Sequence, residues 1–422
     1  MLLYERGSAT EDLGPDDLRE GMRVALDQLG PRQRVVAVPP DITRLHSRAG
    51  DLTCIAREYY GERLTDVLPA TGTHSAMTES EISLMFPGLP ADLFREHDWL
   101  DGVTDIGTVP ASTVSDLSNG VLDVAWTAQI DDLLAARKHD LVLSIGQVVP
   151  HEVMGMAGYN KNVLIGAGGH STIHKTHYLS AVYGIERTLG RIDNPMKRLL
   201  NYASDHYLES WPIVYVLTVL SRDATGQLKI RGLFIGDDET CFINAARLSL
   251  EINVELLDAP LEKVVVYLDP GEFRSTWLGN KSVYRTRLAI KDGGQLIVLA
   301  PGLREFGEHH EMDRLIRKYG YIGNAKILAA VKENDDLQQG LSAAAHLIHG
   351  SSEERFSITY CPGNLTADEI NSVNYEYAEL APMLERYNPE IMTEGFNTLP
   401  DGEPVYFIHN PAVGLWAYRE RF

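Results

Sequence analysis

The stretch Arg34–Arg44, RVVAVPPDITR, decides the fold class. Its run of small β-branched and apolar residues is typical of a strand that is buried on both faces, and the polar motif DITR begins where that run ends. Residues 51–64 have helical periodicity, and residues 64–74, LTDVLPATGTH, form a second strand-like run. A strand, a helix and a strand in this order predict a βαβ unit with parallel strands.

The same alternation continues along the first half of the chain. Thr78 and Glu81 have the spacing of a capping box, which predicts that a helix begins there. Further elements are predicted as a helix over 131–138, a strand over 141–146, and strands over 213–220 and 228–236. The last two runs are joined by SRDATGQ and should form an antiparallel hairpin added to the parallel sheet.

A second domain is predicted from about Pro260 onward. Its strands are expected at 264–270, 295–301 and 355–362, with helical sequence between them, and the tail 404–411 is expected to return as an edge strand. The predicted fold class is therefore α/β, with two α/β domains and a cleft between them. Residues 1–259 would form the cofactor-binding and catalytic domain with a mostly parallel sheet. Residues 260–422 would close the cleft, although the tail could return to the first domain.

The composition excludes several functional classes. The chain has 422 residues with a formal charge of −21, which disfavours binding to nucleic acid and to anionic membranes. No apolar run approaches the roughly 18–20 residues that span a bilayer. The N-terminal sequence has no secretory signal pattern, and three widely spaced cysteines make a disulfide framework improbable. A cytoplasmic protein is expected.

Three polar motifs follow directly on predicted strands. They are DITR (Asp41–Arg44), GTH (Gly72–His74) and PHEV (Pro150–Val153). Ligands of open parallel sheets bind outside the carboxyl ends of the strands, so these motifs should meet at one edge of one sheet. In that position His74 and His151 could form an acid–base pair. Asp41 and Arg44 could form a salt bridge, or Arg44 could bind an anion through its guanidinium.

The segment 151–177 is the densest in reactive groups. It contains four histidines, Lys161 and a glycine-rich turn, and His170, His174 and His177 have i, i+4, i+7 spacing on one predicted helix face. Such a face could bind a metal, which makes a zinc-dependent hydrolase one alternative. A metal-binding or anion-binding protein without catalysis is another alternative, although it leaves His74 and His151 without a function.

Together these motifs resemble the nickel-dependent lactate racemase family. The likeness rests on DITR, GTH, PHEV with Lys161 after it, a histidine sixteen residues beyond that lysine, and a lysine in the second domain. The resemblance implies a nickel-pincer nucleotide bound covalently to Lys161, with His177 as the protein ligand to nickel. It also implies that His74 and His151 are the catalytic pair.

The resemblance assigns the remaining residues as well. Asp41 and Arg44 would organise the cofactor or substrate, and Lys281 would face either of them across the cleft. Proteins that synthesise the cofactor would be partners in loading. The expected activity is racemisation or epimerisation at C2 of a 2-hydroxy acid by hydride transfer, with the two histidines as acid and base.

Three positions depart from the family pattern. Ser75 follows the GTH histidine where the family has arginine, the approach to Lys161 is GYNK in place of a glycine-rich SGGRK, and Leu278 stands where a glutamine is usual. The lysine that would link the cofactor and the histidine that would bind nickel are retained, whereas residues near these motifs differ from the family pattern. The expected substrate is therefore a 2-hydroxy acid other than lactate, such as a larger one or a sugar acid.

Overall fold

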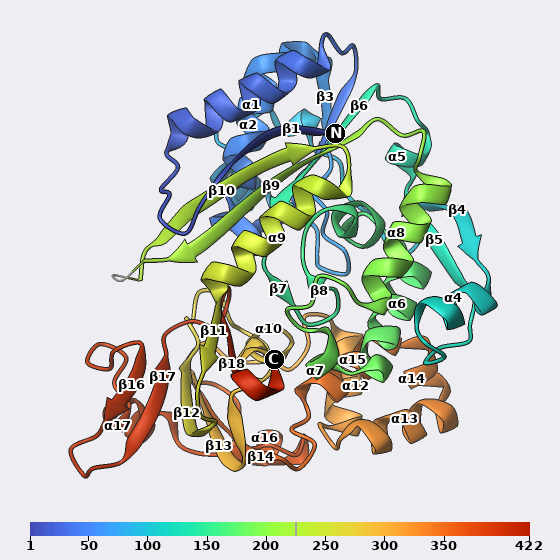
Figure 1. The fold of residues 1–422 in the computed structure, drawn as a ribbon. Coiled ribbons are helices and arrows are strands. Elements are labelled where there is room, and N and C mark those ends of the chain that lie inside the picture. Colours follow the sequence, from blue (N-terminus) through green and yellow to red (C-terminus); the bar gives the residue numbers. More distant parts are fainter. Residues whose placement is uncertain (224–225) are drawn as a thin grey trace. The chain divides into compact units, whose positions relative to one another are not determined.

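The computed structural model describes residues 1–223 and 226–422, which form two compact units (Figure 1). Unit 1 contains residues 1–179 and 187–253, and unit 2 contains residues 180–186 and 254–422. The sequence-based domain boundary at 259/260 stays a prediction. Two residues of the predicted hairpin turn, 224 and 225, lie outside the described residues.

Unit 1 is built from the following strands and helices. The strands are β1 (Leu2–Gly7), β2 (Val35–Val38), β3 (Leu64–Val67), β4 (Val103–Val109), β5 (Trp126–Asp131), β6 (Leu141–Gln147), β7 (Pro150–His151), β8 (Gly155–Met156), β9 (Ile213–Arg222) and β10 (Leu228–Gly236). The α-helices are α1 (Pro15–Leu29), α2 (Ala49–Tyr60), α3 (Glu79–Met85), α4 (Ala111–Leu117), α5 (Asp132–Ala135), α6 (His170–Tyr183), α7 (Ile185–Thr188), α8 (Pro195–Tyr207) and α9 (Glu239–Asn253), of which α6 and α7 cross between the units.

The main sheet of unit 1 has the strand order β1-β10-β9-β6-β2-β3. Strands β9, β6, β2 and β3 run parallel to one another, whereas β10 pairs antiparallel with both β9 and β1. This arrangement confirms the predicted parallel sheet and the antiparallel hairpin added to it. It also makes β6, β2 and β3 adjacent, so the three motifs that follow these strands start from one sheet edge.

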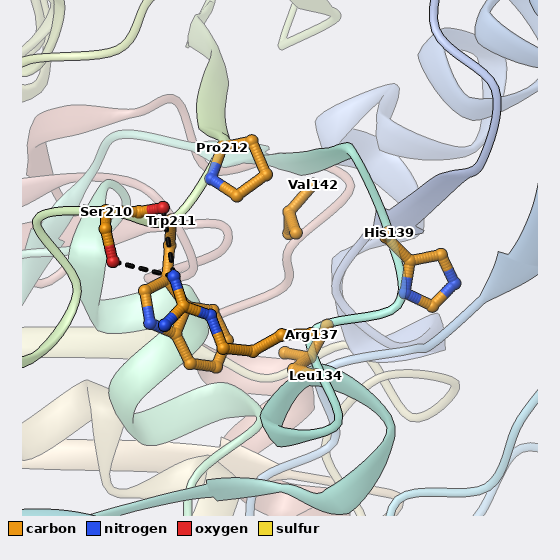
Figure 2. A pocket seen from close by; sticks show the side chains of 7 residues that line it. All are labelled: Leu134, Arg137, His139, Val142, Ser210, Trp211 and Pro212. Carbon is orange, nitrogen blue, oxygen red and sulfur yellow. Dashed lines mark hydrogen bonds between the residues drawn. The ribbon is translucent and has the colours of Figure 1, made fainter.

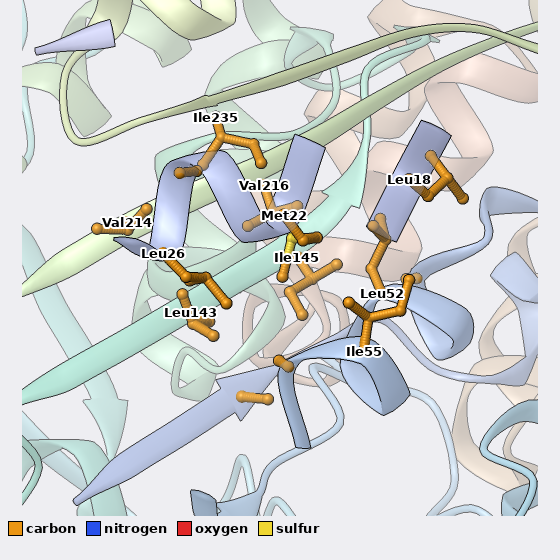
Figure 3. Packing of buried hydrophobic residues seen from close by; sticks show 14 of the residues in the cluster. Leu18, Met22, Leu26, Leu52, Ile55, Leu143, Ile145, Val214, Val216 and Ile235 are labelled. Atoms are coloured by element: carbon orange, nitrogen blue, oxygen red, sulfur yellow. The ribbon is translucent and has the colours of Figure 1, made fainter. Parts of the chain in front are cut away.

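Helices cover both faces of this sheet. Leu18, Met22 and Leu26 of α1 and Leu52 of α2 pack on one face, against alternate residues of β6, β9 and β10 such as Ile145 (Figure 3). Alternate side chains of a strand point to opposite faces, so the residues between these face the other side. Helix α9 packs against β9 and β10 there. The near-complete burial of apolar side chains on both faces explains why these strands read as continuous hydrophobic runs.

Two predicted elements are shorter in the structure. The run over 64–74 is a strand only to Val67, because Pro69 has no backbone N–H for a sheet, and a single parallel bridge then joins Ala70 to Pro40. The predicted helix over 131–138 is reduced to α5, Asp132–Ala135. The capping box is confirmed, since Thr78 Oγ1 accepts a bond from the Glu81 amide at the start of α3.

Unit 2 has a six-stranded sheet and a separate pair of strands. The strands of this unit are β11 (Val254–Leu257), β12 (Leu261–Tyr267), β13 (Ile290–Ala300), β14 (Phe356–Pro362), β15 (Glu376–Tyr377), β16 (Gly395–Thr398), β17 (Pro404–Ile408) and β18 (Leu415–Tyr418). Its α-helices are α10 (Thr276–Gly279), α11 (Lys281–Thr286), α12 (His310–Tyr319), α13 (Asn324–Glu333), α14 (Asp335–Gln339), α15 (Leu341–Gly350), α16 (Ala367–Ser372) and α17 (Leu380–Arg386).

The sheet order in unit 2 is β15-β14-β13-β12-β17-β16, with β11 and β18 forming a separate parallel pair. The three predicted strands are present as β12, β13 and β14. The prediction of an edge strand in the tail is wrong, because β17 lies between β12 and β16 and pairs with both. Within the described residues, no helix is both long enough and apolar enough to cross a membrane.

Candidate active site

The DITR and GTH motifs meet at the carboxyl edge of the unit 1 sheet. His74 Nδ1 and Asp41 Oδ2 are 2.5 Å apart, which joins residues that are 33 positions apart in the sequence. Gly72 has a φ of +57°, which an L side chain rarely adopts, and the His74 amide donates to the Thr71 carbonyl. This turn, together with the neighbouring strands β2 and β3, brings the imidazole to the carboxylate.

Asp41 is buried and ionised. Burial alone would raise the pKa of its carboxyl group, but the charge of His74 and hydrogen bonds from His74 and Thr43 outweigh burial and lower the pKa to about 2. The Arg44 guanidinium, which is half-buried, donates to the backbone carbonyl and the hydroxyl of Thr43. The hydrogen-bond partner of the carboxylate is therefore His74, whereas Arg44 contributes a nearby positive charge.

The PHEV motif forms a small hairpin of β7 and β8, in which His151 pairs with Gly155. The ring nitrogen Nδ1 of His151 accepts hydrogen bonds from the backbone amides of Val153 (3.1 Å) and Met154 (3.3 Å). A neutral imidazole that accepts at Nδ1 carries its proton at Nε2. The hairpin thus fixes both the orientation of the half-buried His151 ring and its tautomer.

Lys161 lies at the start of a π-helical turn, Asn162–Gly166, an irregularity that is common at functional sites. Desolvation and the positive charge of Arg44 lower the pKa of its amine to about 8, although the side chain retains some access to solvent. The negative charges of Glu152 and Asp41 act in the opposite direction. Lys161 is thereby linked electrostatically to the DITR and PHEV motifs, and its lowered pKa makes the uncharged, nucleophilic amine more abundant near neutral pH than in an ordinary lysine.

Helix α6 confirms the predicted helical spacing of its three histidines, but the surroundings of the three rings differ. His177 Nδ1 donates to the Ile173 carbonyl at 2.7 Å, while desolvation lowers the pKa of its imidazole to about 4. The ring is therefore neutral with its lone pair at Nε2, as in a metal-ligating histidine held by a backbone carbonyl. His170 is exposed, and the His174 ring lies 5.8 Å from the Trp99 ring.

The described residues give no support to a zinc triad. No group of three or more His, Cys, Asp or Glu side chains in residues 1–223 and 226–422 is arranged to hold a metal ion. The glycine-rich turn before α6 has a packing role, since a Cβ on Gly168 would lie 2.0 Å from the Leu164 carbonyl oxygen. The His170 and Ser171 amides at the helix start bind the Trp99 carbonyl and the Gln129 side chain.

Lys281 belongs to unit 2, where it is the first residue of α11. Its side chain is buried, and its Nζ lies 5.4 Å from the centre of the Phe273 ring. The structure thus brings Asp41, Arg44, His74 and Lys161 together in unit 1, and the relation of Lys281 to them stays a prediction.

Sequence reasoning assigned no role to Glu152 or Lys197. The charge of Glu152 raises the pKa of both Lys161 and His177, and its place inside the PHEV motif was an available signal. Lys197 is buried on α8 and donates to Asn160 Oδ1, next to Lys161 in the chain. Nothing in the local sequence distinguishes Lys197 from a surface lysine.

A separate cavity of about 200 Å³ opens at the amino ends of β6 and β9 (Figure 2). The Arg137 guanidinium lies there, 5.2 Å from the centre of the Trp211 ring, and donates to the carbonyl and hydroxyl of Ser210. Ligands of parallel sheets bind at the opposite, carboxyl ends of the strands. This cavity therefore lies outside the candidate site.

Comparisons with known proteins place the fold. The chain is similar to a Thermotoga maritima protein solved by a structural genomics consortium, with a TM-score of 0.81, 23% identity, and coverage of 96% of this chain and 98% of that chain. It is also similar to the lactate racemase apoprotein from Thermoanaerobacterium thermosaccharolyticum, with a TM-score of 0.71, 17% identity, and coverage of 98% and 94%. No curated protein matches the sequence. Residues 23–188 match the family model of the lactate racemase N-terminal domain.

The matched region contains each motif in unit 1 that carried the resemblance, from DITR to His177. Residues 23–188 thus match the lactate racemase N-terminal domain, in agreement with the resemblance expected from the motifs.

Proposed function

We propose that this protein is a racemase or epimerase that inverts C2 of a 2-hydroxy acid, using a nickel-pincer nucleotide and two histidines. The observation that carries the proposal is the meeting of Asp41, His74 and Lys161 at one sheet edge. The match of residues 23–188 to the lactate racemase N-terminal domain supports the reaction class.

The residues present fit the cofactor that the resemblance implies. Lys161 has an amine whose lowered pKa of about 8 allows it to react covalently, as an attachment point requires. His177 offers a neutral imidazole with its Nδ1–H bound to a carbonyl, which leaves Nε2 as a nitrogen ligand of the kind that suits nickel. When bound, the nickel-pincer nucleotide would accept the C2 hydride of the substrate and return it to the opposite face.

The protein residues would handle protons and the carboxylate. Removing the C2 hydrogen as a proton is unfavourable beside a carboxylate, whereas hydride removal only requires a base for the hydroxyl proton. His74 suits that task because its Nδ1–H donates to Asp41, which leaves the lone pair at Nε2. His151, with a proton at Nε2, suits the return of a proton to the oxygen. Arg44 would bind the substrate carboxylate, with Lys281 as a second candidate.

The proposed substrate is a 2-hydroxy acid other than lactate. Ser75, Tyr159 and Leu278 differ from the family pattern while the anchor Lys161 and the ligand His177 are retained. A panel of single-enantiomer 2-hydroxy acids, from lactate to malate to gluconate, followed by chiral analysis, identifies the class. We expect inversion of a larger member at a higher kcat/KM than lactate.

The cofactor assignment is tested by producing the protein with and without cofactor-synthesis proteins. We expect an intact-mass adduct that maps to Lys161, one nickel per chain, and inversion only in the loaded protein. An unmodified zinc protein with hydrolytic activity would overturn the proposal in favour of the metallohydrolase. Lys161→Ala should lose the adduct, and an adduct that remains on another residue would contradict its location.

A further inference from the structure

Helix α8 carries a buried lysine that the proposed reaction does not use. Lys197 is 2% exposed, and its Nζ lies 3.7 Å from the centre of the Phe242 ring and 4.5 Å from that of Tyr159. The same atom donates to Asn160 Oδ1 at 2.9 Å. A lysine is rarely buried without a specific partner, and here the partner directly precedes the proposed anchor Lys161.

The backbone in front of Lys161 is strained. Tyr159 has a φ of +59°, in the left-handed region that aromatic residues rarely adopt. Its ring is held from two sides, 4.2 Å from the centre of Tyr215 and 5.5 Å from that of Phe242. Such a conformation persists only when the surroundings enforce it, and it is common where function depends on it. In this chain Tyr159 occupies a position that is glycine-rich in the family pattern.

One face of α8 holds the adjacent Asn160. Lys197 Nζ donates to the Oδ1 of Asn160. The Nδ2 of Asn160 in turn donates to Asn201 Oδ1 at 2.8 Å and to Ser204 Oγ at 3.1 Å. The three holding residues have i, i+4, i+7 spacing, so they share one side of the helix. Asn160 is completely buried, and these bonds satisfy both ends of its amide group.

The first turn of the same helix also holds the hairpin that carries His151. Asn194 caps α8 by accepting a bond from the Lys197 amide, and its Nδ2 donates to the Met154 carbonyl at 3.0 Å. Helix α8 therefore binds both the PHEV hairpin and the Asn160–Lys161 segment. The N-cap Asn194 makes the first of these contacts, and Lys197, three residues further along the helix, makes the second.

We propose that Lys197 is a positioning residue for Lys161. Its amine, enclosed by the Tyr159 and Phe242 rings, holds the Asn160 side chain and so fixes the strained turn that presents the Lys161 amine to the site. The inference rests on the proposed function of Lys161 as the covalent anchor for the cofactor. It adds that this chain replaces the flexible, glycine-rich approach to the anchor with a rigid one.

The charge on Lys197 has little direct bearing on Lys161. Burial lowers the pKa of Lys197 to about 7, with Glu239 and Cys241 acting in the opposite direction. A neutral amine still donates a hydrogen bond, so the contact with Asn160 persists in both protonation states. The charges that act on Lys161 come from Arg44, Glu152 and Asp41. A change in Lys161 reactivity on replacing Lys197 would therefore reflect a change in the position of the Lys161 side chain.

The test measures the reactivity of Lys161 in protein without cofactor. The rate of acylation of Lys161 by a small amine-reactive ester is followed by peptide mass spectrometry from pH 6 to pH 11. In the wild-type protein we expect the midpoint near the lowered pKa of about 8. In Lys197→Met, which fills the space without a hydrogen bond, the midpoint should move toward the ordinary lysine value of 10.5 as Lys161 gains solvent.

Two further variants make the result specific. Ser204→Ala removes one of the three contacts to Asn160 with a small change in volume, and it should shift the midpoint in the same direction by a smaller amount. Lys229→Met removes a lysine that pairs with Asp12 on another part of unit 1, and it should leave the midpoint unchanged. Circular dichroism identifies the variants that fold, and Ser204→Ala carries the test if Lys197→Met does not fold.

The inference and the proposed function fail in different ways. A midpoint in folded Lys197→Met and Ser204→Ala equal to that of the wild type overturns the positioning role, whatever reaction the protein catalyses. A shifted midpoint in a protein that never acquires an adduct on Lys161 upholds the positioning role and overturns the anchor assignment instead.

Discussion

His74 and His151 use their Nδ1 atoms in opposite ways. His74 Nδ1 donates to the Asp41 carboxylate, whereas His151 Nδ1 accepts from the Val153 and Met154 amides. The neutral forms of the two rings therefore differ at Nε2, which bears a lone pair in His74 and a proton in His151. A reaction that removes a hydroxyl proton on one side and returns it on the other needs one group of each kind. For His151 to act as the base in turn, the hairpin amides must release Nδ1.

The first prediction concerns the tautomer of His74. In Asp41→Asn the amide can donate to Nδ1, which would move the imidazole proton to Nε2 and remove the base. We expect the rate of inversion by the loaded enzyme to fall by about 10²- to 10⁴-fold. The rate of inversion is measured by chiral analysis of the substrate. Asp51→Asn, which removes a partly exposed ion-pair partner of Arg48 on α2, should leave the rate close to that of the wild type.

The second prediction separates proton transfer from cofactor binding. His74→Asn and His151→Asn retain a polar group near the position of Nδ1 but remove Nε2, so each should reduce inversion by at least about 10²-fold. Nickel content and the mass adduct on Lys161 should stay near the wild-type values, because neither histidine holds the cofactor in the proposed site. Full turnover by either variant would show that the two-histidine assignment is wrong.

Much of the fold could be predicted from the strand-like runs. Residues 35–38 are apolar throughout, and residues 141–146 are apolar except for Ser144, because β2 and β6 are covered on both faces. The tail strand was harder, since β17 reads the same from sequence whether it lies at an edge or between β12 and β16. Strand order in unit 2 depends on pairings between distant residues, which local pattern does not encode.

The candidate site could be predicted in part. The position of DITR and GTH after parallel strands predicted that the two motifs meet at one sheet edge, whereas the contact between Asp41 and His74 was not predicted. The spacing of the histidines in α6 predicted their shared helix face, but it could not show that His177 turns its Nδ1 to Ile173. Lys197 was missed because its burial arises from two rings, of Tyr159 and Phe242, that lie far away in the chain.

The third prediction distinguishes a single nickel ligand from a histidine triad. His177→Ala should lower the nickel content of the loaded protein by about tenfold or more, because it removes the proposed protein ligand. The adduct on Lys161 should remain, since the covalent link does not involve the imidazole. His170→Ala changes an exposed residue on the same helix and should retain nickel. Metal analysis of the purified variants decides between a single ligand and a triad, because a triad would lose its metal in both variants.

The fourth prediction concerns the stability of protein without cofactor. The fold lowers the pKa of Lys197 from 10.5 to about 7, so the unfolded chain binds more protons between these values and wild-type stability rises with pH there. The penalty for burying the ammonium is fully present below about pH 7 and disappears above about pH 10.5. Its upper limit is roughly 5 kcal/mol, partly offset by the bond to Asn160, which contributes about 1 kcal/mol. Lys197→Met should therefore be more stable than the wild type at pH 6, with the difference shrinking toward pH 10. Urea unfolding of both proteins across this range measures it. A difference that does not change with pH would mean that Lys197 is not held in a desolvated site.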